Sequence, residues 1–398
     1  MDAPGAGSLV GDKADPLRAG PPPPSLAVVK ADPESKKKWL QLSGHQGEVF
    51  MCTWNPMEKI LASGSADGVC RLWGVADVDA SKLEAIDTTL EMRSSLLLHT
   101  VYPLERFKDV TSVTWSSNGL YLATGCYDGI ARVWDRQGEQ KLLLSEHTGP
   151  VFSLKWNKSS THMLSGSYDR RSIVWDPNTG AVVKSYLLHN APVLDGDWRD
   201  DNVFATCSSD MAIHVCNFSS EDNKPIATFI GHKDEVNTVC WSPSGKFLAS
   251  CSDDRTAKLW TLENGLVHDL VGHSKEIYTI RWCTSPVTTP FTTFGNELLC
   301  TASFDGSVRV WDANSGAMLL DLKRHLQAIY SIAPSPNGKL LATGSLGGYV
   351  CVWSIETGML VHEFRGAGDT FDVSWSHDGS MLCACFSSGT LNIVHANF

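Results

Sequence analysis

The sequence predicts an all-β fold, a closed β-propeller of eight four-stranded blades, and three observations lead to this prediction. One pattern of residues recurs from one end of the chain to the other at intervals of roughly 40 to 45 residues, which is the length of one blade. The copies contain short segments of alternating apolar residues, such as EVFMCTW and VCRLW, which are typical of strands. Most copies end on a Trp. A single repeat of this kind cannot bury its apolar faces, so neighbouring copies must stack into one ring.

The clearest copy is the segment Gly231–Trp260, which reads GHKDEVNTVCWSPSGKFLASCSDDRTAKLW. Asp254 lies six residues before Trp260, the hydroxyl of Ser250 four residues before Asp254, and His232 22 residues before it. Three further copies keep all of these residue types, the last with an insertion: His45, Ser63, Asp67 and Trp73; His147, Ser165, Asp169 and Trp175; and His273, Thr301, Asp305 and Trp311. The Gly-His pair and the terminal Trp are typical of WD40 repeats.

These residue types predict a buried hydrogen-bond relay inside each blade. His, Ser or Thr, Asp and Trp side chains can satisfy one another's donors and acceptors. Because an orphaned buried polar group costs about 1–3 kcal/mol, the relay should stabilise the blade. The His, Ser and Asp residues resemble a catalytic triad, but a triad does not recur in blade after blade. The chain also has no nucleophile elbow, P-loop or zinc-protease motif. We therefore predict a structural relay, no catalytic residue, no enzyme activity and no cofactor.

The two ends of the chain are predicted to meet. Residues 1–38 are proline-rich and lack apolar periodicity, so they are expected to form a disordered tail ahead of a propeller spanning 39–398. Blade one begins at Gly44 and ends at Trp73. The segment Trp39–Leu42 precedes it, whereas blade eight lacks an outer strand. We expect this segment to complete blade eight, which would close the ring and remove its open edge.

The blades between these ends depart from the pattern in several places. The insertion Gly74–Lys108 follows blade one, and its last part, LLLHTVYPL, is predicted to be the outer strand. Blade two lacks the Gly-His pair, blade four has Cys216 in place of Trp, and blade six carries a predicted loop, TSPVTTPFTTFGNE. Blade seven has Gly347 at the Asp position. Blade eight has Ser388 and Val394 at the Asp and Trp positions, which degrades its relay.

Composition and charge limit the class of protein. The formal net charge of the chain is −11, and the tail has five acidic and six basic residues, so the propeller itself is strongly acidic. Such a surface disfavours general nucleic-acid binding and suits basic peptides. No run of 18 apolar residues and no secretory signal is present. The 12 cysteines form no C-x-x-C pair, which predicts reduced, buried thiols, no metal site and a location inside the cell.

Two positions in each blade are predicted to line the top rim of the ring. One lies four residues before the inner-strand Trp, and the other directly precedes the Asp position. Eight of the residues at these positions are aromatic: Phe50, Tyr127, Phe152, Tyr168, Tyr278, Phe304, Tyr330 and Phe371. The carboxylates beside them are Glu48, Asp109, Glu235, Asp253 and Glu276. Singly, these aromatic residues could fill the mouth of the channel. As a ring, they predict a face that binds an extended basic peptide.

Several stretches resemble the transducin-β-like/ebi family of WD-repeat corepressor subunits. They are DVTSVTW, LATGCYDGIARVW, NVFATCSSDMAIHVC, ASCSDDRTAKLW, HDLVGHSKEIYTIRW and ASFDGSVRVWD, and they include the unusual IHVC ending of blade four. The resemblance covers roughly Trp39–Phe398. It implies a nuclear protein, with the cytoplasm as a second location, whose partners are corepressor and histone deacetylase subunits and histone tails. Family members also carry an N-terminal LisH dimerisation module, which residues 1–38 do not resemble.

Two functions are compatible with this resemblance. The first is a non-enzymatic scaffold of a nuclear corepressor and histone deacetylase complex that binds partner peptides on its top face. The alternative is a substrate-recognition or exchange adaptor of a ubiquitin ligase, since family members are described as recruiting that machinery. Neither function requires a membrane or direct sequence-specific binding of nucleic acid. A heterotrimeric G-protein β role is disfavoured, because that family has seven blades and a helical N-terminal segment.

Overall fold

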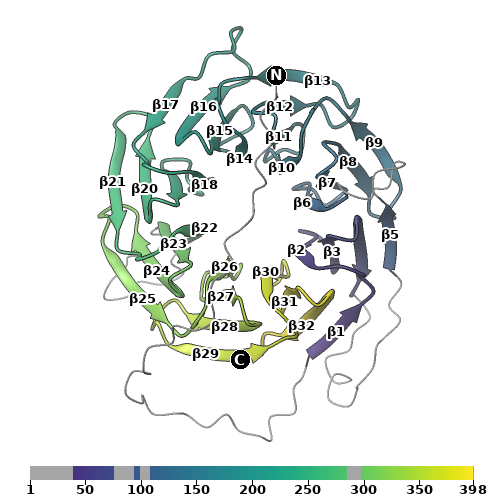
Figure 1. Cartoon of the computed structure of the whole chain (residues 1–398), viewed down its shortest axis with the longest axis vertical. Coiled ribbons are helices and arrows are strands. Elements are labelled where there is room, and N and C mark those ends of the chain that lie inside the picture. Colours follow the sequence, from purple (N-terminus) through teal and green to yellow (C-terminus); the bar gives the residue numbers. More distant parts are fainter. Residues whose placement is uncertain (1–38, 76–93, 99–107, 285–296, 398) are drawn as a thin grey trace, which may run out of the picture. The chain divides into compact units, whose positions relative to one another are not determined.

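The computed structural model describes residues 39–75, 94–98, 108–284 and 297–397. In this part of the chain, 32 strands form eight four-stranded antiparallel sheets, and no helix occurs. Figure 1 shows the sheets as blades around a common centre, in chain order. This arrangement confirms the predicted all-β propeller of eight blades.

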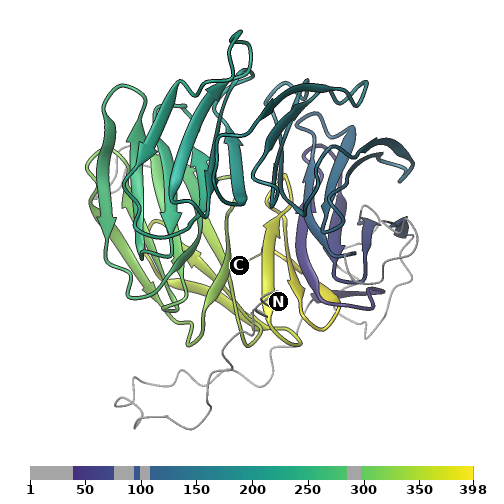
Figure 2. The same cartoon turned by 45° about the horizontal axis from the view of Figure 1, so that its top comes forward.

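Each blade consists of an inner, a second, a third and an outer strand. The inner strands are β2 (Val49–Trp54), β6 (Val110–Trp115), β10 (Val151–Trp156), β14 (Val193–Trp198), β18 (Val236–Trp241), β22 (Ile277–Thr284), β26 (Ile329–Pro334) and β30 (Thr370–Trp375). The second strands are β3 (Ile60–Ser65), β7 (Tyr121–Cys126), β11 (Met163–Ser167), β15 (Val203–Ser208), β19 (Leu248–Ser252), β23 (Glu297–Ser303), β27 (Leu340–Ser345) and β31 (Met381–Phe386). In the tilted view of Figure 2, the inner strands stand side by side around the centre of the ring.

The third and outer strands follow in the same order. The third strands are β4 (Val69–Gly74), β8 (Ala131–Asp135), β12 (Ser172–Trp175), β16 (Ala212–Asn217), β20 (Thr256–Thr261), β24 (Ser307–Asp312), β28 (Tyr349–Ser354) and β32 (Thr390–His395). The outer strands are β5 (Ser94–Leu98), β9 (Gln140–Leu144), β13 (Val182–Tyr186), β17 (Ala227–Ile230), β21 (Gly265–Val271), β25 (Met318–Lys323), β29 (Leu360–Arg365) and β1 (Trp39–Ser43).

The hydrophobic core lies between blades rather than in one central mass. Its buried residues fall into eight clusters, and each cluster joins two neighbouring blades. The second strands are buried on both faces, which explains their nearly continuous apolar sequences. Neighbouring blades approach closely there: a Cβ added to Gly64 of β3 would lie 2.8 Å from Val110 of the next blade. Each blade is thus stabilised by both of its neighbours.

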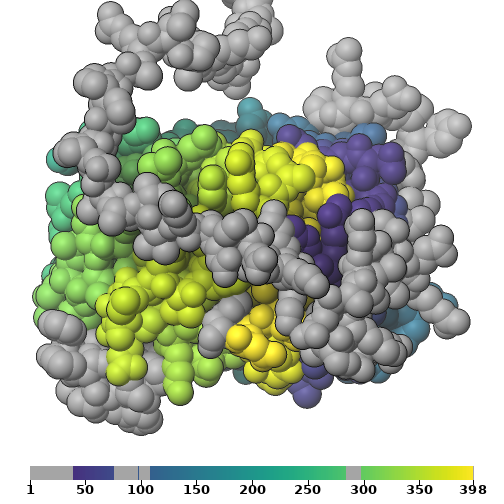
Figure 3. All heavy atoms as spheres, turned by 90° about the horizontal axis from the view of Figure 1, so that it is seen from below, coloured from purple at the N-terminus to yellow at the C-terminus, as the bar shows by residue number. Residues whose placement is uncertain are grey.

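Strand β1 completes blade eight and closes the ring, as predicted. It pairs antiparallel with β32 from Trp39 opposite Val394 to Ser43 opposite Thr390. Leu40 and Leu42 are buried in the cluster between blades eight and one. Figure 3 shows the result from the side, where the yellow C-terminal blade lies directly beside purple N-terminal residues.

Two predicted segments need correction. The outer strand of blade one is Ser94–Leu98, so only the first three residues of LLLHTVYPL belong to it. The strand extends backwards because it pairs with the length of β4, from Leu98 opposite Val69 to Ser94 opposite Trp73. In blade six, the ends of the predicted loop are strand residues, since Thr284 pairs with Glu297. Residues 285–296, the tail 1–38 and the remaining part of the first insertion lie outside the described residues, and their predictions stay predictions.

The last two findings concern the cysteines and possible membrane-spanning helices. All 12 cysteines are free thiols, and all except Cys240 are buried. Within the described residues, no helix is long and apolar enough to cross a membrane.

Candidate functional site

Each complete relay places a buried His between a carboxylate and a hydroxyl. In blade five, His232 Nδ1 lies 2.8 Å from Asp254 Oδ2, and His232 Nε2 lies 2.7 Å from Ser250 Oγ. Trp260 Nε1 donates to the same Oγ at 2.8 Å, and the N–H of Lys233 donates to Asp254 at 2.9 Å. The same contacts occur in blades one, three and six among His45, Ser63, Asp67 and Trp73; His147, Ser165, Asp169 and Trp175; and His273, Thr301, Asp305 and Trp311. The relay ties the entry loop of a blade to its second and third strands.

Two blades build the relay differently: the sequence indicates His189 and Asp210 in blade four, whereas the role of Arg132 in blade two was not predicted. In blade two, the guanidinium of Arg132 is 1% exposed and donates to Asp128 Oδ2 at 2.9 Å, the role that His has elsewhere. The signal available in the sequence was an Arg four residues after Asp in a blade without His. In blade four, His189 contacts Asp210 at 3.1 Å and Thr206 at 3.0 Å without a Trp.

We expect the relays to make the propeller sensitive to acid in a defined window. Burial alone would raise the pKa of Asp169, but hydrogen bonds from His147 and the N–H of Thr148 outweigh it and lower the pKa to about 2. The pKa of Asp67 is lowered to about 2 in the same way. The pKa of an Asp in an unfolded chain is about 4. These carboxylates therefore stabilise the folded state above about pH 4, and this contribution is lost as the pH falls from about 4 to about 2.

Urea unfolding at pH values from neutral to about 2.5 tests this window. The Asp169→Asn variant should be less stable than the wild type at neutral pH and should lose less stability on acidification. The exposed turn variant Glu356→Gln is the control and should follow the wild type. An Asp169→Asn variant as acid-sensitive as the wild type would contradict the role of the relay.

The predicted rim positions of the inner strands are β-bulges. In every inner strand, the pairing with the second strand skips one residue near the start of the strand. A bulge leaves one residue unpaired and changes the direction of its side chain. The eight skipped residues are Phe50, Thr111, Phe152, Leu194, Asn237, Tyr278, Tyr330 and Phe371. Counting back from the Trp identified these positions, but the bulge becomes visible only from the strand pairing.

Backbone hydrogen bonds bring the second rim position of a blade beside the bulge. In blade six, the N–H of Phe304 donates to the carbonyl of Glu276 at 3.0 Å, and Glu276 lies two residues before the bulge at Tyr278. The rings of Phe304 and Tyr278 are therefore stacked, with centroids 5.6 Å apart. The same bond is made by Tyr127 to Asp109 and by Tyr168 to Pro150, both at 2.9 Å.

The eight aromatic rim residues form two arcs. The long arc crosses blades six, seven, eight and one, with ring centroids 5.0 to 6.1 Å apart: Tyr278, Phe304, Tyr330, Phe371 and Phe50. The short arc lies on blades two and three, with centroids 6.3 and 6.5 Å apart: Tyr127, Phe152 and Tyr168. Such distances are typical of packed aromatic pairs. The rings also reach the surface, since Tyr278 is 43% and Tyr168 58% exposed.

Polar and acidic residues separate the arcs on blades four and five. Glu235 is exposed and accepts a hydrogen bond from Ser209 Oγ at 3.0 Å. Asp253 accepts from Asn237 Nδ2 at 2.7 Å, while burial and the charges of nearby carboxylates, among them Glu276, raise its pKa. We call Glu235, Asp253 and Glu276 the acidic sector. The other two of the five predicted carboxylates lie away from this sector: Glu48 is exposed on blade one, and Asp109 is partly buried on blade two.

The inner strands also carry carboxylates near the centre of the ring, which the sequence analysis did not anticipate. Burial raises the pKa of Asp197, which accepts from the N–H of Trp241 of the next blade at 2.8 Å. Asp372 accepts from Ser331 Oγ at 2.6 Å and from the N–H of Cys52 at 3.0 Å, so it joins three blades. These bonds give the carboxylates a structural role. Among the described residues, no group of three or more His, Cys, Asp or Glu could hold a metal ion.

Comparison with known proteins places this geometry in context. The family model "WD domain, G-beta repeat" matches residues 223–261, 264–312 and 316–354, and the model "Nucleolar protein 10-like, N-terminal domain" matches residues 36–209. The chain is 43% identical to the WD40 repeat-containing protein HOS15 of Arabidopsis thaliana over 89% of its own length and 57% of that protein. It is 42% identical to the F-box-like/WD repeat-containing protein TBL1X of Mus musculus over 94% of its own length and 67% of that protein.

A solved structure shows the same architecture. The C-terminal WD40 domain of Sif2 superposes with a TM-score of 0.76 at 25% identity, covering 91% of this chain and 98% of that one. The corresponding full-length yeast protein is the SIR4-interacting protein SIF2, 28% identical over 68% of this chain. The chain thus spans between about half and two thirds of the length of these full-length relatives.

Proposed function

This chain belongs to the transducin β-like family of WD40-repeat propeller proteins, and from that premise we propose that it is a non-enzymatic scaffold whose top face binds extended basic peptides of its partners. The propeller is a closed ring of eight blades, and each blade packs on both of its neighbours. A rigid surface with preformed anchors binds at a low entropic cost.

The observation that carries the proposal is the arrangement of two aromatic arcs and an acidic sector on one rim. Interface hot spots favour Trp, Tyr and Arg, and exposed aromatic faces attract Lys and Arg by cation–π interaction. Tyr278 contacts Phe304 and Tyr330 at one end of the long arc, and Glu276 belongs to the acidic sector in the same blade. A basic chain crossing this junction would meet ring faces on one side and carboxylates on the other.

Family membership supports the finer part of the proposal. We infer that the partners are corepressor and histone deacetylase subunits, with histone tails as the basic peptides, and that the protein acts in the nucleus. Affinity purification of the full chain from its own cells, followed by mass spectrometry, tests this inference. Recovery of deacetylase and corepressor subunits is expected. Recovery of cullin-type ligase subunits without them would contradict the scaffold and favour a ubiquitin-ligase adaptor.

Substitutions on the long arc test the top face directly. Tyr278→Ala and Phe371→Ala should each weaken binding of a histone-tail peptide about 5- to 30-fold, the size of a hot-spot loss of about 1–2 kcal/mol. The measurement is isothermal titration calorimetry with the folded propeller. Leu266→Ala is the matched control, because Leu266 is 45% exposed on outer strand β21. Unchanged affinity in both arc variants would mean that the rings only fill the mouth of the ring.

A further inference from the structure

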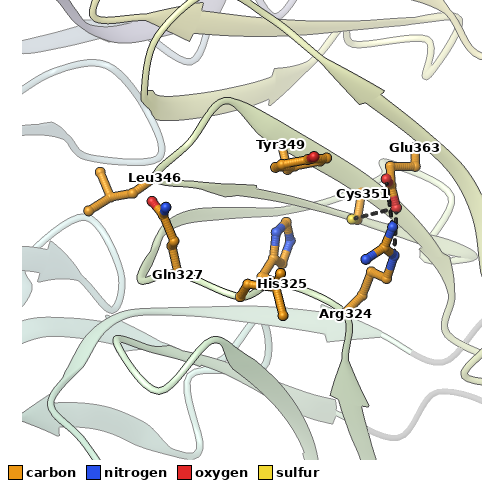
Figure 4. A pocket seen from close by; sticks show the side chains of 8 residues that line it. Arg324, His325, Gln327, Leu346, Tyr349, Cys351 and Glu363 are labelled. Atoms are coloured by element: carbon orange, nitrogen blue, oxygen red, sulfur yellow. Dashed lines mark hydrogen bonds and ion pairs between the residues drawn. The ribbon is translucent and has the colours of Figure 1, made fainter. Parts of the chain in front are cut away.

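Blade seven contains a small cavity at the place where other blades have their relay carboxylate. Its volume is about 100 Å³. Figure 4 shows His325 on one side and the ring of Tyr349 on the other, with Gln327 at one end and Cys351 and Arg324 at the opposite end. The cavity opens to solvent beside the side chain of Leu326, which is 93% exposed.

Five other blades show what normally occupies this place. In blades one, three, four, five and six, an Asp carboxylate lies 2.8 to 3.1 Å from the Nδ1 of the relay His. The same carboxylate accepts the backbone N–H of the residue after the His, at 2.8 to 3.0 Å. Each of these blades therefore presents two donors to one carboxylate.

Blade seven keeps the donors but lacks the carboxylate. His325 Nε2 still lies 2.7 Å from Thr343 Oγ1, and Trp353 Nε1 still donates to that oxygen at 3.1 Å. The Asp position is Gly347, and His325 Nδ1 contacts Ser345 Oγ at 2.7 Å instead. The N–H of Leu326, which corresponds to the second donor, faces no acceptor among the described residues.

A second position in blade seven also carries a smaller side chain, which leaves room for a ligand. Cys351 occupies the position at which blades one, two and six carry Arg71, Arg132 and Arg309. In blades one and six, this Arg lies against the Gly that precedes the relay His. Blade seven has neither residue at its usual position: Cys351 replaces the Arg, and the residue before His325 is Arg324, whose guanidinium pairs with Glu363 at 2.8 Å beside the cavity. The cavity therefore has the ion pair of Arg324 and Glu363 at its edge and a small thiol at its base.

We propose that the blade-seven cavity binds a carboxylate group, which takes the place of the missing Asp. The ligand oxygens accept from the N–H of Leu326 and from His325 Nδ1, and Ser345 Oγ turns away from the imidazole. In blades three to six, the equivalent Ser Oγ bonds to backbone groups, so this second arrangement is already present in the molecule. Burial and the charge of Arg324 lower the pKa of His325 to about 4, so the imidazole is neutral and can donate from Nδ1 without a net charge.

The carboxylate could be a small free acid or the side chain of an Asp or Glu in a partner protein. The exposed Leu326 beside the opening gives a partner peptide an apolar contact that a free acid would not use. This site takes an acidic group and lies on one blade, so it does not depend on the basic-peptide function of the two arcs.

The test is a titration of the propeller labelled with ¹⁵N in its histidine rings. The probes are propionate, its neutral isostere propionamide, and N-acetyl-aspartate N-methylamide, all at constant ionic strength. We expect saturable shifts of the His325 signals with both acids and none with propionamide. Tighter binding of the aspartate derivative than of propionate would assign the site to an acidic side chain, and equal binding would assign it to small free acids. Non-saturable shifts, or equal shifts with propionamide, would overturn the proposal.

Two variants make the test specific. Cys351→Arg places in blade seven the residue that three other blades carry at this position. In blades one and six this Arg coexists with a carboxylate bound to the relay His, so the variant should fold and leave the carboxylate site open. Gly347→Asp supplies the carboxylate from the chain itself, on a backbone that disfavours Asp because φ is 81° and the N–H of Gly347 donates to Asp369 Oδ1 at 2.7 Å. Gly347→Asp should abolish the response to propionate, whereas Cys351→Arg should keep it, as should Met359→Ala, which alters a residue 67% exposed outside the cavity. Loss of the propionate response in a folded Cys351→Arg variant would also overturn the proposal, because blades one and six hold their carboxylate beside this Arg, and this variant stays informative if Gly347→Asp does not fold.

Discussion

Replacing Trp260 with Ala is expected to lower the free energy of unfolding by about 3–5 kcal/mol, because a large aromatic side chain is removed from a packed interior. Trp260 is 2% exposed and lies in the cluster between blades four and five. Its ring stacks on Phe229 with centroids 5.1 Å apart, and its Nε1 donates to Ser250 Oγ at 2.8 Å. The substitution therefore leaves a cavity and removes one donor from a relay. Urea unfolding monitored by far-UV circular dichroism measures the change, because this signal does not depend on the fluorescence of the removed Trp.

The Trp260→Phe variant separates the two effects. It keeps most of the ring volume and removes the Nε1 donor, so the expected loss is about 0.5–1.5 kcal/mol. The natural comparison is blade four, whose relay of His189, Asp210 and Thr206 forms with Cys216 in the Trp position. A Trp260→Ala variant that unfolds at the same urea concentration as the wild type would show that the Trp contributes little to the packing of blades four and five.

Removing β1 is expected to destabilise the whole ring. Deletion of residues 1–43 takes away Leu40 and Leu42, which are 3% and 1% exposed. Each buried Leu contributes roughly 2–5 kcal/mol. The deletion also leaves β32 as an unpaired edge. The expected result is a markedly lower melting temperature and aggregation on size-exclusion chromatography, whereas deletion of residues 1–35 should change neither.

A pair of point variants tests the same contact without truncation. Leu42→Ala should lower the free energy of unfolding by about 2–5 kcal/mol, and Gln41→Ala, at an exposed position of the same strand, should change it by less than about 0.5 kcal/mol. Equal melting of the two deletions, together with a neutral Leu42→Ala, would mean that closure through β1 is dispensable.

The number of blades and the closure by β1 could be predicted because both depend on spacing. The His, Asp and Trp positions mark each blade, and the one blade without an outer strand leaves Trp39–Ser43 as its complement. The boundary of β5 was predicted less well, because the insertion contains several apolar residues and only the pairing with β4 selects Ser94–Leu98. Apolar composition alone does not define a strand end.

The candidate sites depended more strongly on tertiary structure. Tyr278, Tyr330 and Phe371 occur at the predicted rim positions, but their contacts link three blades and therefore follow from the closed ring. The role of Arg132 was not predicted, because an Arg four residues after Asp also occurs as Arg71 and Arg309 in blades that keep their His, and only the missing His sets blade two apart. The blade-seven cavity likewise requires that two substitutions, Gly347 for the Asp and Cys351 for the Arg, lie side by side in the folded blade. The sequence shows each substitution, but it does not show that both face the same cavity.

The pairing of β1 with β32 has a consequence for the biogenesis of the protein. During synthesis, β1 leaves the ribosome before every other strand of the propeller, whereas β32 is translated last. The eighth blade therefore cannot form before every other blade has been translated, and the apolar residues of β1 stay without their partner until β32 has been made. Loop closure over such a separation is slow, and unpaired apolar strands are prone to aggregate in the interval. Chaperones that shield β1 during this interval should therefore raise the yield of folded protein.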